Sequence, residues 1–434
     1  MKRRIRNVSI ILICSVAAGI FLLTLVFLLP VEAARKHVEE SLYEMLEVAE
    51  DPEGSAERKE IINLKENFTD CLMVQNALEK VEGQGPLAHA MNIYHYDLGN
   101  ESTWLTEESL PVFLRRGEEG MYLREYSRYW HGYLVVLKPL LMCMSWVYVE
   151  KLLLFVQGGL LLAVLGAAFY RRRAGIGLGV LYTFLFMKPL RIWFSLAMSV
   201  CWLITLTAVL VLLLGFDRME TKKRHEEFFL LVGILTAYMD FLTYPVVTLG
   251  VPLCVWLVQA GERKGWKETL RQTFWNCACW AVGYVGMWGM KWVASDVIFR
   301  TGTLRDAVWS VINRTSPLDG YGSVFSGVER TLAAVLGQYD SPLYAIGFWV
   351  LFLAALLSVG CRMAKGRSRE WGMSAACLAA AALFPVGWLV LTQNHTAIHC
   401  IFTFRIMGVS VMALWCMVLC SVQGLDRGTL IRKR

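Results

Sequence analysis

Long apolar runs, separated by short polar segments, are the main pattern along this chain. The clearest are Ile10–Leu29, Leu152–Tyr170, Leu196–Phe216 and Ala375–Leu391. Each is close to the roughly 20 apolar residues with which an α-helix crosses a hydrocarbon core about 30 Å thick. The pattern therefore predicts an all-α integral membrane protein, folded as a polytopic helical bundle.

Polar breaks divide the apolar runs into about ten transmembrane helices. Met187–Arg191 splits the run 174–216 into two helices, and Asp240–Pro245 splits the run 228–259 into two more. The other expected helices occupy residues 8–30, 147–170, 272–296, 342–360, 374–392 and 401–423.

Clusters of lysine and arginine between these runs predict the orientation of the bundle. They lie at Lys2–Arg6, Arg171–Arg173, Lys222–Arg224, Arg263–Lys267, Arg362–Arg369 and Arg432–Arg434. Because cytoplasmic loops are enriched in these residues, one orientation places every cluster inside. Both termini are then cytoplasmic, residues 425–434 form a basic cytoplasmic tail, and 31–146 and 297–341 lie outside the plasma membrane. The net charge of +7 accordingly indicates contact with anionic membrane lipid, and no nucleic acid is expected.

Residues 31–146 predict an external domain between a first transmembrane helix, 1–30, and a helical membrane domain, 147–424. Glu, Ala and Leu at helical spacing make this domain mostly helical. We expect 133–146 to be a juxtamembrane helix at the outer surface, with membrane insertion as the alternative. The N-terminal run is longer than the apolar part of most signal peptides, about 7–15 residues, which favours an uncleaved helix.

Polar residues in or beside membrane spans are candidates for function because they are costly to place in lipid. Most of them here fall at the expected external helix ends. They are Lys188, Arg191, Asp240, Tyr244, Lys291, His395, His399 and Arg405, and the external domain adds Asp70. Lysine or arginine near the headgroup plane suits a lipid-linked phosphate. A carboxylate suits removal of a proton from an acceptor hydroxyl during glycosyl transfer.

Each of these residues also has a structural interpretation. Lys291 can extend toward the headgroups, Lys188 and Arg191 can anchor the chain at the interface, and Asp240 can cap a broken helix. His395 and His399 are spaced for a metal only if their segment is helical, and no third ligand is apparent. We therefore expect no metal site and no cofactor, although a divalent cation without such a ligand cluster is left open.

Five stretches carry a resemblance to known proteins. They are Asn67-Phe-Thr-Asp-Cys71, Tyr129-Trp-His-Gly-Tyr133, Asp240-Phe-Leu-Thr-Tyr-Pro245, Gly283-Tyr-Val-Gly-Met-Trp-Gly-Met-Lys-Trp292, and Asn394-His-Thr-Ala-Ile-His399 with Phe402-Thr-Phe-Arg405. In these, the chain resembles a group of Firmicutes-like bacterial multi-pass membrane proteins. Its plan, a first helix followed by a large external loop and many spans, is similar to the GT-C superfamily of glycosyltransferases.

The GT-C resemblance implies transfer of a sugar from a polyprenyl-phosphate donor to an acceptor at the outer face. Asp70 would then match the first-loop carboxylate that acts as base, and Asp240 is the next candidate. Lys188, Arg191, Lys291 and Arg405 would hold the donor phosphate. Tyr129, His131, Tyr244, His395 and His399 would contact substrate.

Two other classes of function are compatible with the sequence. A transporter or flippase of a lipid-linked or polar substrate would use broken helices such as those around Asp240. However, the polar residues gather at one face rather than at the membrane midplane, and the two halves show no repeat. A non-enzymatic assembly or sensor subunit would bind a partner through 31–146, but it has no need for Lys291 in the membrane.

Overall fold

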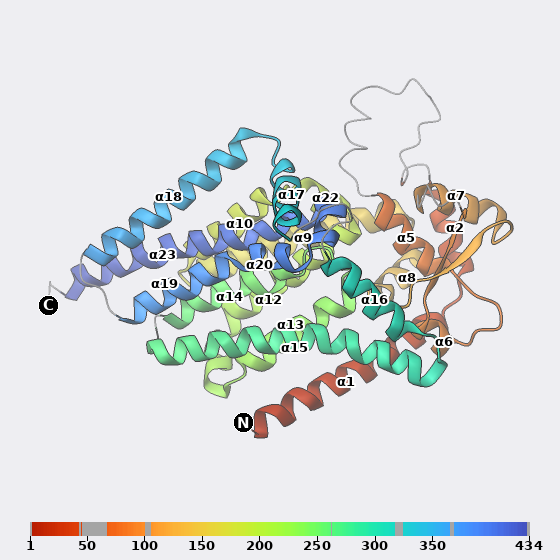
Figure 1. The fold of residues 1–434 in the computed structure, drawn as a ribbon, viewed down its shortest axis with the longest axis horizontal. Coiled ribbons are helices and arrows are strands. Elements are labelled where there is room, and N and C mark those ends of the chain that lie inside the picture. The colour runs from red at the N-terminus through yellow and green to blue at the C-terminus, as the bar shows by residue number, and fades with distance from the viewer. Residues whose placement is uncertain are drawn as a thin grey trace.

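The computed structural model describes residues 2–42, 45, 67–99, 106–261, 263–316, 324–364 and 369–431, and most of them are helical (Figure 1). Six helices in this part of the chain are long and apolar enough to cross a membrane. They are Arg4–Phe27, Trp146–Tyr170, Leu196–Lys222, Pro342–Ala364, Gly372–Leu391 and Cys400–Val422. The chain is therefore an all-α multi-pass membrane protein.

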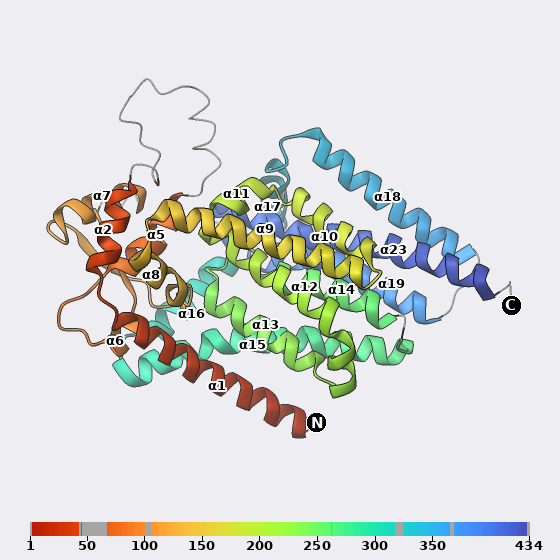
Figure 2. The same ribbon diagram turned by 180° about the vertical axis from the view of Figure 1, so that it is seen from behind.

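Long helices lying side by side, with short helices at some of their ends, form the bundle. They are α1 (Lys2–Phe27), α9 (Trp146–Tyr170), α10 (Ala174–Phe186), α11 (Pro189–Phe194), α12 (Leu196–Lys222), α13 (His225–Met239), α14 (Val246–Gly261), α15 (Trp266–Phe299), α18 (Pro342–Ala364), α19 (Arg369–Ala382), α20 (Phe384–Leu391), α21 (Gln393–Ile398), α22 (Cys400–Thr403), η1 (Phe404–Met407) and α23 (Gly408–Ile431). The reverse view shows α9 running along α12 (Figure 2).

The centre of the bundle is α14. It is apolar on all sides, and its residues from Val246 to Ala260 are buried, as expected of a helix without a polar face. It packs against α12, α13, α15, α19 and α23. The breaks expected at 187–191 and 240–245 both appear, as the turn from α10 into α11 and the loop between α13 and α14. We call this loop, residues 240–245, the α13–α14 loop.

Two glycines allow α13 and α15 to pack closely. A Cβ on Gly233 would lie 2.2 Å from the carbonyl oxygen of Trp280, and a Cβ on Gly283 would lie 2.3 Å from that of Leu230. Both distances are far below van der Waals contact, so each backbone occupies the space that a side chain would need. Small residues at such crossings are typical of helix pairs in membranes.

The described residues of 31–146, which we call the loop domain, lie together at one end of the bundle (Figure 1). They contain α2 (Glu32–Glu40), α5 (Asn67–Leu78), α6 (Pro86–Met91), β1 (Tyr94–Asp97), α7 (Thr106–Arg116), β2 (Tyr122–Glu125) and α8 (Leu134–Cys143). The two strands pair antiparallel, with Tyr94 opposite Glu125. The start of α1 and the end of α23 lie away from this domain (Figure 1).

The segment 133–146, expected as a juxtamembrane helix at the outer surface, is the ten-residue α8. Leu134, Leu137, Lys138 and Leu141 of α8 are buried, because the helix packs against α1, α2 and α5. Its apolar face is therefore covered by protein.

Residues 297–341, expected as an external loop, contain two further helices, α16 (Thr303–Thr315) and α17 (Val324–Gly337). The last expected helix begins as two short turns, α22 and η1, before α23 continues to Ile431. Part of the expected tail is therefore helical, and its end, 432–434, lies outside the described residues, as do 365–368 of the basic cluster Arg362–Arg369.

Ion pairs join the basic loops at the end of the bundle opposite the loop domain. Asp217 accepts hydrogen bonds from both Arg171 and Arg263. Glu220 pairs with Lys264 at 2.6 Å, and Glu226 pairs with Arg4. The basic clusters at 2–6, 171–173, 222–224 and 263–267 therefore lie at one end of the molecule.

Candidate functional site

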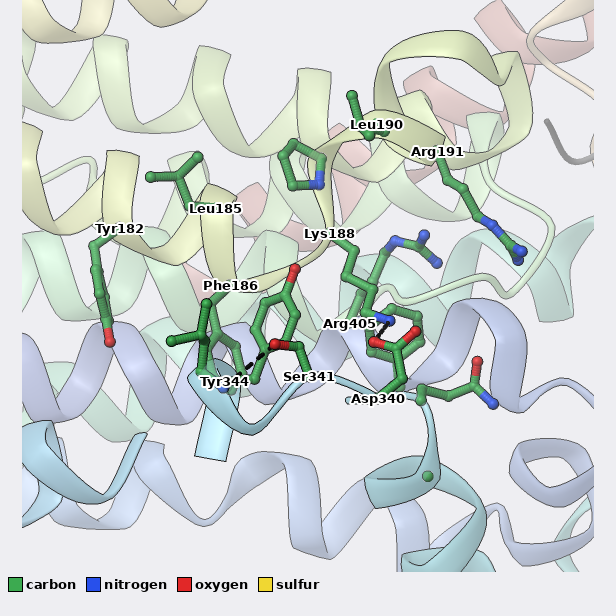
Figure 3. A pocket seen from close by; sticks show the side chains of 15 residues that line it. Tyr182, Leu185, Phe186, Lys188, Leu190, Arg191, Asp340, Ser341, Tyr344 and Arg405 are labelled. Atoms are coloured by element: carbon green, nitrogen blue, oxygen red, sulfur yellow. Dashed lines mark hydrogen bonds and ion pairs between the residues drawn. The ribbon is translucent and has the colours of Figure 1, made fainter. Parts of the chain in front are cut away.

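The structure contains a pocket of about 870 Å³ (Figure 3). Its elements α11 and α17 lie toward the end of the bundle that carries the loop domain (Figure 2). The pocket lies between α10, α11 and the connection from α17 to α18. Its lining residues are Tyr182, Leu185, Phe186, Lys188, Pro189, Leu190, Arg191, Gly337, Gln338, Asp340, Ser341, Leu343, Tyr344, Phe404 and Arg405. Three of the four cations predicted to hold a phosphate, Lys188, Arg191 and Arg405, are among them.

The charges of this pocket are unbalanced. Against its three cations stands a single lining carboxylate, that of Asp340. Lys188 donates to Asp340 Oδ1 at 2.6 Å, as Figure 3 shows. The Lys188 Nζ also lies 5.6 Å from the ring centroid of Tyr344, within the range of cation–π attraction. The pocket is therefore suited to an anion.

Local backbone geometry sets the position of Lys188. The residue ends the turn after α10 and has φ +55° and ψ +76°, in the left-handed region that a residue with a Cβ rarely adopts. Pro189 then begins α11, where its fixed φ suits the first helical position and its missing N–H costs nothing. The reversal between α10 and α12 thus turns the lysine toward the α17–α18 connection.

Arg405 lies at the base of the pocket and is fully buried. Its Nη1 donates to the carbonyl oxygen of Ile401 at 2.8 Å and approaches the sulfur of Met198 at 3.8 Å. The guanidinium carbon is 4.6 Å from the ring centroid of Phe404. Because the short elements α22 and η1 interrupt the helix here, an arginine can point into the pocket.

Asp70, the predicted base, is buried next to the start of α12. Its carboxylate accepts the backbone N–H groups of Leu196 at 3.1 Å and Ala197 at 2.9 Å, and the hydroxyl of Ser195 at 3.2 Å. These N–H groups belong to the first turn of a helix, which has no internal acceptors for them. Asp70 does not line the pocket of Figure 3. Asp70 and Arg405 nevertheless contact the same turn of α12. Asp70 binds Ala197, and Arg405 approaches the adjacent Met198.

The α13–α14 loop holds Asp240 and Tyr244 inside the protein. Asp240 accepts the backbone N–H of Thr243 at 3.0 Å and the Thr243 hydroxyl, and burial raises its pKa to about 6. The hydroxyl of Tyr244 donates to the carbonyl oxygen of Met198. The Asp240 contacts hold the loop in its turn, and the Tyr244 contact ties the loop to α12. Asp240 therefore has a structural role within the break between α13 and α14.

Tyr129 and His131, predicted to contact substrate, pack around Phe241 of the same loop. The ring centroids of Tyr129, His131 and Tyr133 lie 5.5, 5.0 and 5.0 Å from that of Phe241. All three are edge-on to it, a favoured aromatic geometry. This aromatic cluster anchors the loop domain to the bundle.

Lys291 has a different surrounding from the other predicted cations. It is fully buried in α15, its Nζ donates to the carbonyl oxygen of Tyr129, and it lies 5.7 Å from the ring centroid of Trp130. The side chain therefore binds the loop domain and is not part of the pocket lining.

His395 and His399 stand beside α16. The Nε2 of His395 donates to the carbonyl oxygen of Leu242 at 2.9 Å, which leaves Nδ1 to accept from Arg314. Burial, together with the charge of Arg314, lowers the pKa of both histidines, that of His399 to about 4. Within the described ranges, no three His, Cys, Asp or Glu side chains are grouped to hold a metal ion.

The predicted residues thus divide between a pocket and a set of structural contacts. Lys188, Arg191 and Arg405 share the pocket, although Lys188 and Arg405 are 217 positions apart in the sequence. Asp70, Lys291 and His395 each contact backbone groups of other elements. Asp240 contacts the backbone of its own loop.

Sequence reasoning missed Asp340, the carboxylate of the pocket. Asp340-Ser-Pro342 has the composition of a helix start, so it gave no sign of a binding role.

No protein-family model, no curated protein and no solved structure matches the chain.

Proposed function

We propose that the protein is a membrane glycosyltransferase that takes a sugar from a polyprenyl-phosphate donor, and that the pocket holds the donor phosphate. The observation that carries this proposal is the grouping of Lys188, Arg191 and Arg405 in one pocket with one opposing carboxylate. Arginine and lysine are the side chains that bind phosphate oxygens most strongly.

The apolar part of the pocket supports a lipid ligand. Leu185, Leu190 and Leu343 line it and are about half exposed or more, at 53%, 47% and 74%. Tyr182 and Leu185 lie toward one end in Figure 3, and the three cations lie toward the other. A ligand that fits this arrangement has a charged head and an apolar chain, as a polyprenyl phosphate does.

The proposed topology has ten membrane crossings, with both termini in the cytoplasm of a cell bounded by the plasma membrane. It counts the shorter or more polar α10, α13, α14 and α15 with the six apolar helices. The ion pairs that gather four basic clusters at one end support a cytoplasmic assignment for that end. The loop domain and the pocket are then external.

In the proposed reaction an acceptor hydroxyl attacks the anomeric carbon while the bond from that carbon to the phosphate oxygen breaks. Polyprenyl phosphate leaves with the bonding electron pair, and the pocket cations stabilise its charge. A carboxylate takes the proton of the hydroxyl. Asp70 is the candidate base indicated by the resemblance, Asp240 is the second, and Asp340 joins them because it lines the pocket.

Binding measurements in lipid nanodiscs test this proposal. The probe is a polyprenyl monophosphate, and the uncharged polyprenol is its control. Lys188→Met and Arg191→Met are each expected to weaken phosphate binding about ten- to hundredfold, the effect of losing one charged hydrogen bond. Lys151→Met is the matched control. Lys151 is an exposed cation near the start of α9, and it lies outside the pocket.

Equal binding of the phosphate and the alcohol by the unmodified protein would contradict the proposal. Tight binding of the phosphate without sugar transfer to any acceptor would instead favour a flippase or an assembly subunit. Transfer is measured as release of polyprenyl phosphate from the sugar-linked donor.

A further inference from the structure

The ion pair between Lys188 and Asp340 spans the pocket from one wall to the other. Lys188 belongs to the turn between α10 and α11, and Asp340 belongs to the connection between α17 and α18. The two residues are 152 positions apart in the sequence. Figure 3 shows the lysine amine meeting the carboxylate inside the lining.

The two partners differ in their exposure. The side chain of Lys188 is 26% exposed, whereas that of Asp340 is 77% exposed. The ammonium is therefore largely enclosed by the pocket, and the carboxylate approaches it from the solvent side. An ion pair with one partner so exposed contributes little stability, because water solvates the separated carboxylate well. It can be exchanged for another anion.

The carboxylate also keeps its charge at neutral pH. The hydrogen bond and the charge of Lys188 hold the pKa of Asp340 below its ordinary value. An ionised Asp340 therefore neutralises one of the three cations when the pocket is without a ligand. Arg191 and Arg405 line the same pocket, so an entering phosphate meets two guanidinium groups in addition to the ammonium that Asp340 binds.

We propose that Asp340 is a specificity-determining residue whose carboxylate a ligand phosphate must displace from Lys188. This inference rests on the proposed function, in which the pocket takes a lipid phosphate. The donor phosphate, a diester with one negative charge, replaces the carboxylate and also meets the two arginines. The polyprenyl monophosphate left after transfer, with close to two negative charges, makes the same exchange. A neutral lipid cannot replace it, so Asp340 excludes uncharged lipids from the pocket.

Displacement requires only a local change. Asp340 stands two residues before Pro342, the first residue of α18, and its side chain already faces solvent. Rotation of this side chain removes the carboxylate from Lys188 while α18 keeps its place. The released carboxylate then lies at the mouth of the pocket, beside the bound headgroup.

A double-mutant cycle tests the exchange. Binding of polyprenyl monophosphate in nanodiscs is compared among the unmodified protein, Asp340→Asn, Lys188→Met and the double variant. We expect Asp340→Asn to tighten binding about two- to fivefold, because one exposed ion pair no longer competes. Because the competition acts only through Lys188, the double variant should bind like Lys188→Met alone. Asp306→Asn is the matched control, since Asp306 is also an exposed carboxylate, paired with Arg128 at 3.2 Å outside the pocket.

The outcomes separate the inference from the proposed function. Unchanged affinity in Asp340→Asn, or a gain that persists beside Lys188→Met, overturns the exchange while the binding of phosphate stands. Failure of all four proteins to prefer the phosphate over polyprenol overturns the proposed function and the inference with it. Competition by inorganic phosphate distinguishes a free phosphate from a lipid headgroup as the ligand, and the exchange predicts tighter binding of either by Asp340→Asn.

Discussion

The carboxylate of Asp70 accepts the backbone N–H of Ala197 at 2.9 Å, across 127 positions of the sequence. Together with the Leu196 N–H and the Ser195 hydroxyl, this contact ties α5 of the loop domain to the first turn of α12. A negative group at this position also interacts favourably with the helix dipole. Asp70 thus supports the start of α12, whose Met198 lies beside the pocket residue Arg405.

Replacement of Asp70 by asparagine is expected to destabilise the protein. The amide group replaces one accepting oxygen by a donor, so one N–H of the first turn of α12 loses its acceptor. We expect the free energy of unfolding to fall by about 1–3 kcal/mol. The thermal unfolding midpoint of purified protein in detergent measures this, and an unchanged midpoint would contradict the capping role.

The same variant tests the proposed chemistry. If Asp70 is the base, Asp70→Asn should reduce sugar transfer about 10²–10⁴-fold per folded molecule. Donor binding should stay nearly intact, because Asp70 does not line the pocket. Normal turnover by the folded fraction would assign Asp70 to structure alone, and Asp340 and Asp240 would then be tested in the same assay.

Lys291→Met is expected to lower stability but to leave phosphate binding unchanged. The ammonium is buried and donates to the carbonyl oxygen of Tyr129, so its loss leaves that oxygen without this donor, at a cost of about 1–3 kcal/mol. Thermal unfolding and polyprenyl-phosphate binding are measured on the same preparation. A weaker affinity for the phosphate would show that Lys291 acts on the donor, as the sequence first indicated.

Gly283→Ala is expected to disrupt the pairing of α13 with α15. Its Cβ would meet the carbonyl oxygen of Leu230 at 2.3 Å and the backbone nitrogen of Ile234 at 3.1 Å, and a neighbouring backbone cannot move as a side chain can. We expect a loss of several kcal/mol or a failure to fold. Gly289→Ala, in the same helix, is the control, because its Cβ would meet nothing within 4 Å. Equal yields of folded protein for the two variants would contradict the close packing.

The sequence predicted the breaks in the bundle better than the lengths of its helices. Pro189 and Pro245 lie beside polar residues at 187–191 and 240–245, so the sequence predicted both interruptions of the apolar runs. The apolar run in α15 indicated only 272–296, whereas the helix spans Trp266–Phe299. Its first turns, 266–271, carry charged residues, which continue the helix without an apolar signal. At the other end, the three apolar residues 297–299 follow Asp296, where the prediction stopped.

The sequence predicted the candidate site only in part. Charge at a helix end marks residues such as Lys188 and Arg405, and these do converge. Whether a buried polar side chain meets a ligand or a backbone group depends on tertiary packing. The contacts of Lys291 with Tyr129 and of His395 with Leu242 join residues far apart in the sequence. The residues around each position therefore could not predict them.

Acid is expected to destabilise the loop domain through His95. Burial lowers the pKa of this histidine to about 4, from an ordinary value of 6.5. The unfolded chain therefore takes up a proton near pH 6.5, while the folded protein takes it up only near pH 4. His95 thus makes the folded state less stable as the pH falls through this window, by up to about 3 kcal/mol. His95→Gln should flatten the pH dependence of the unfolding midpoint between pH 6.5 and 4, and parallel curves would contradict this assignment.

The 34 residues of α15 make a helix about 51 Å long, whereas the hydrocarbon core is only about 30 Å thick. Some 20 Å of rigid helix therefore extends beyond the core. Because Lys291 and Trp292 near the end of α15 bind backbone carbonyls of Tyr129 and Arg128, α15 carries the loop domain on a stiff support. In the proposed topology the height of that domain above the membrane is a fixed dimension. Movement of the loop domain relative to the membrane would then have to involve α15 as a whole.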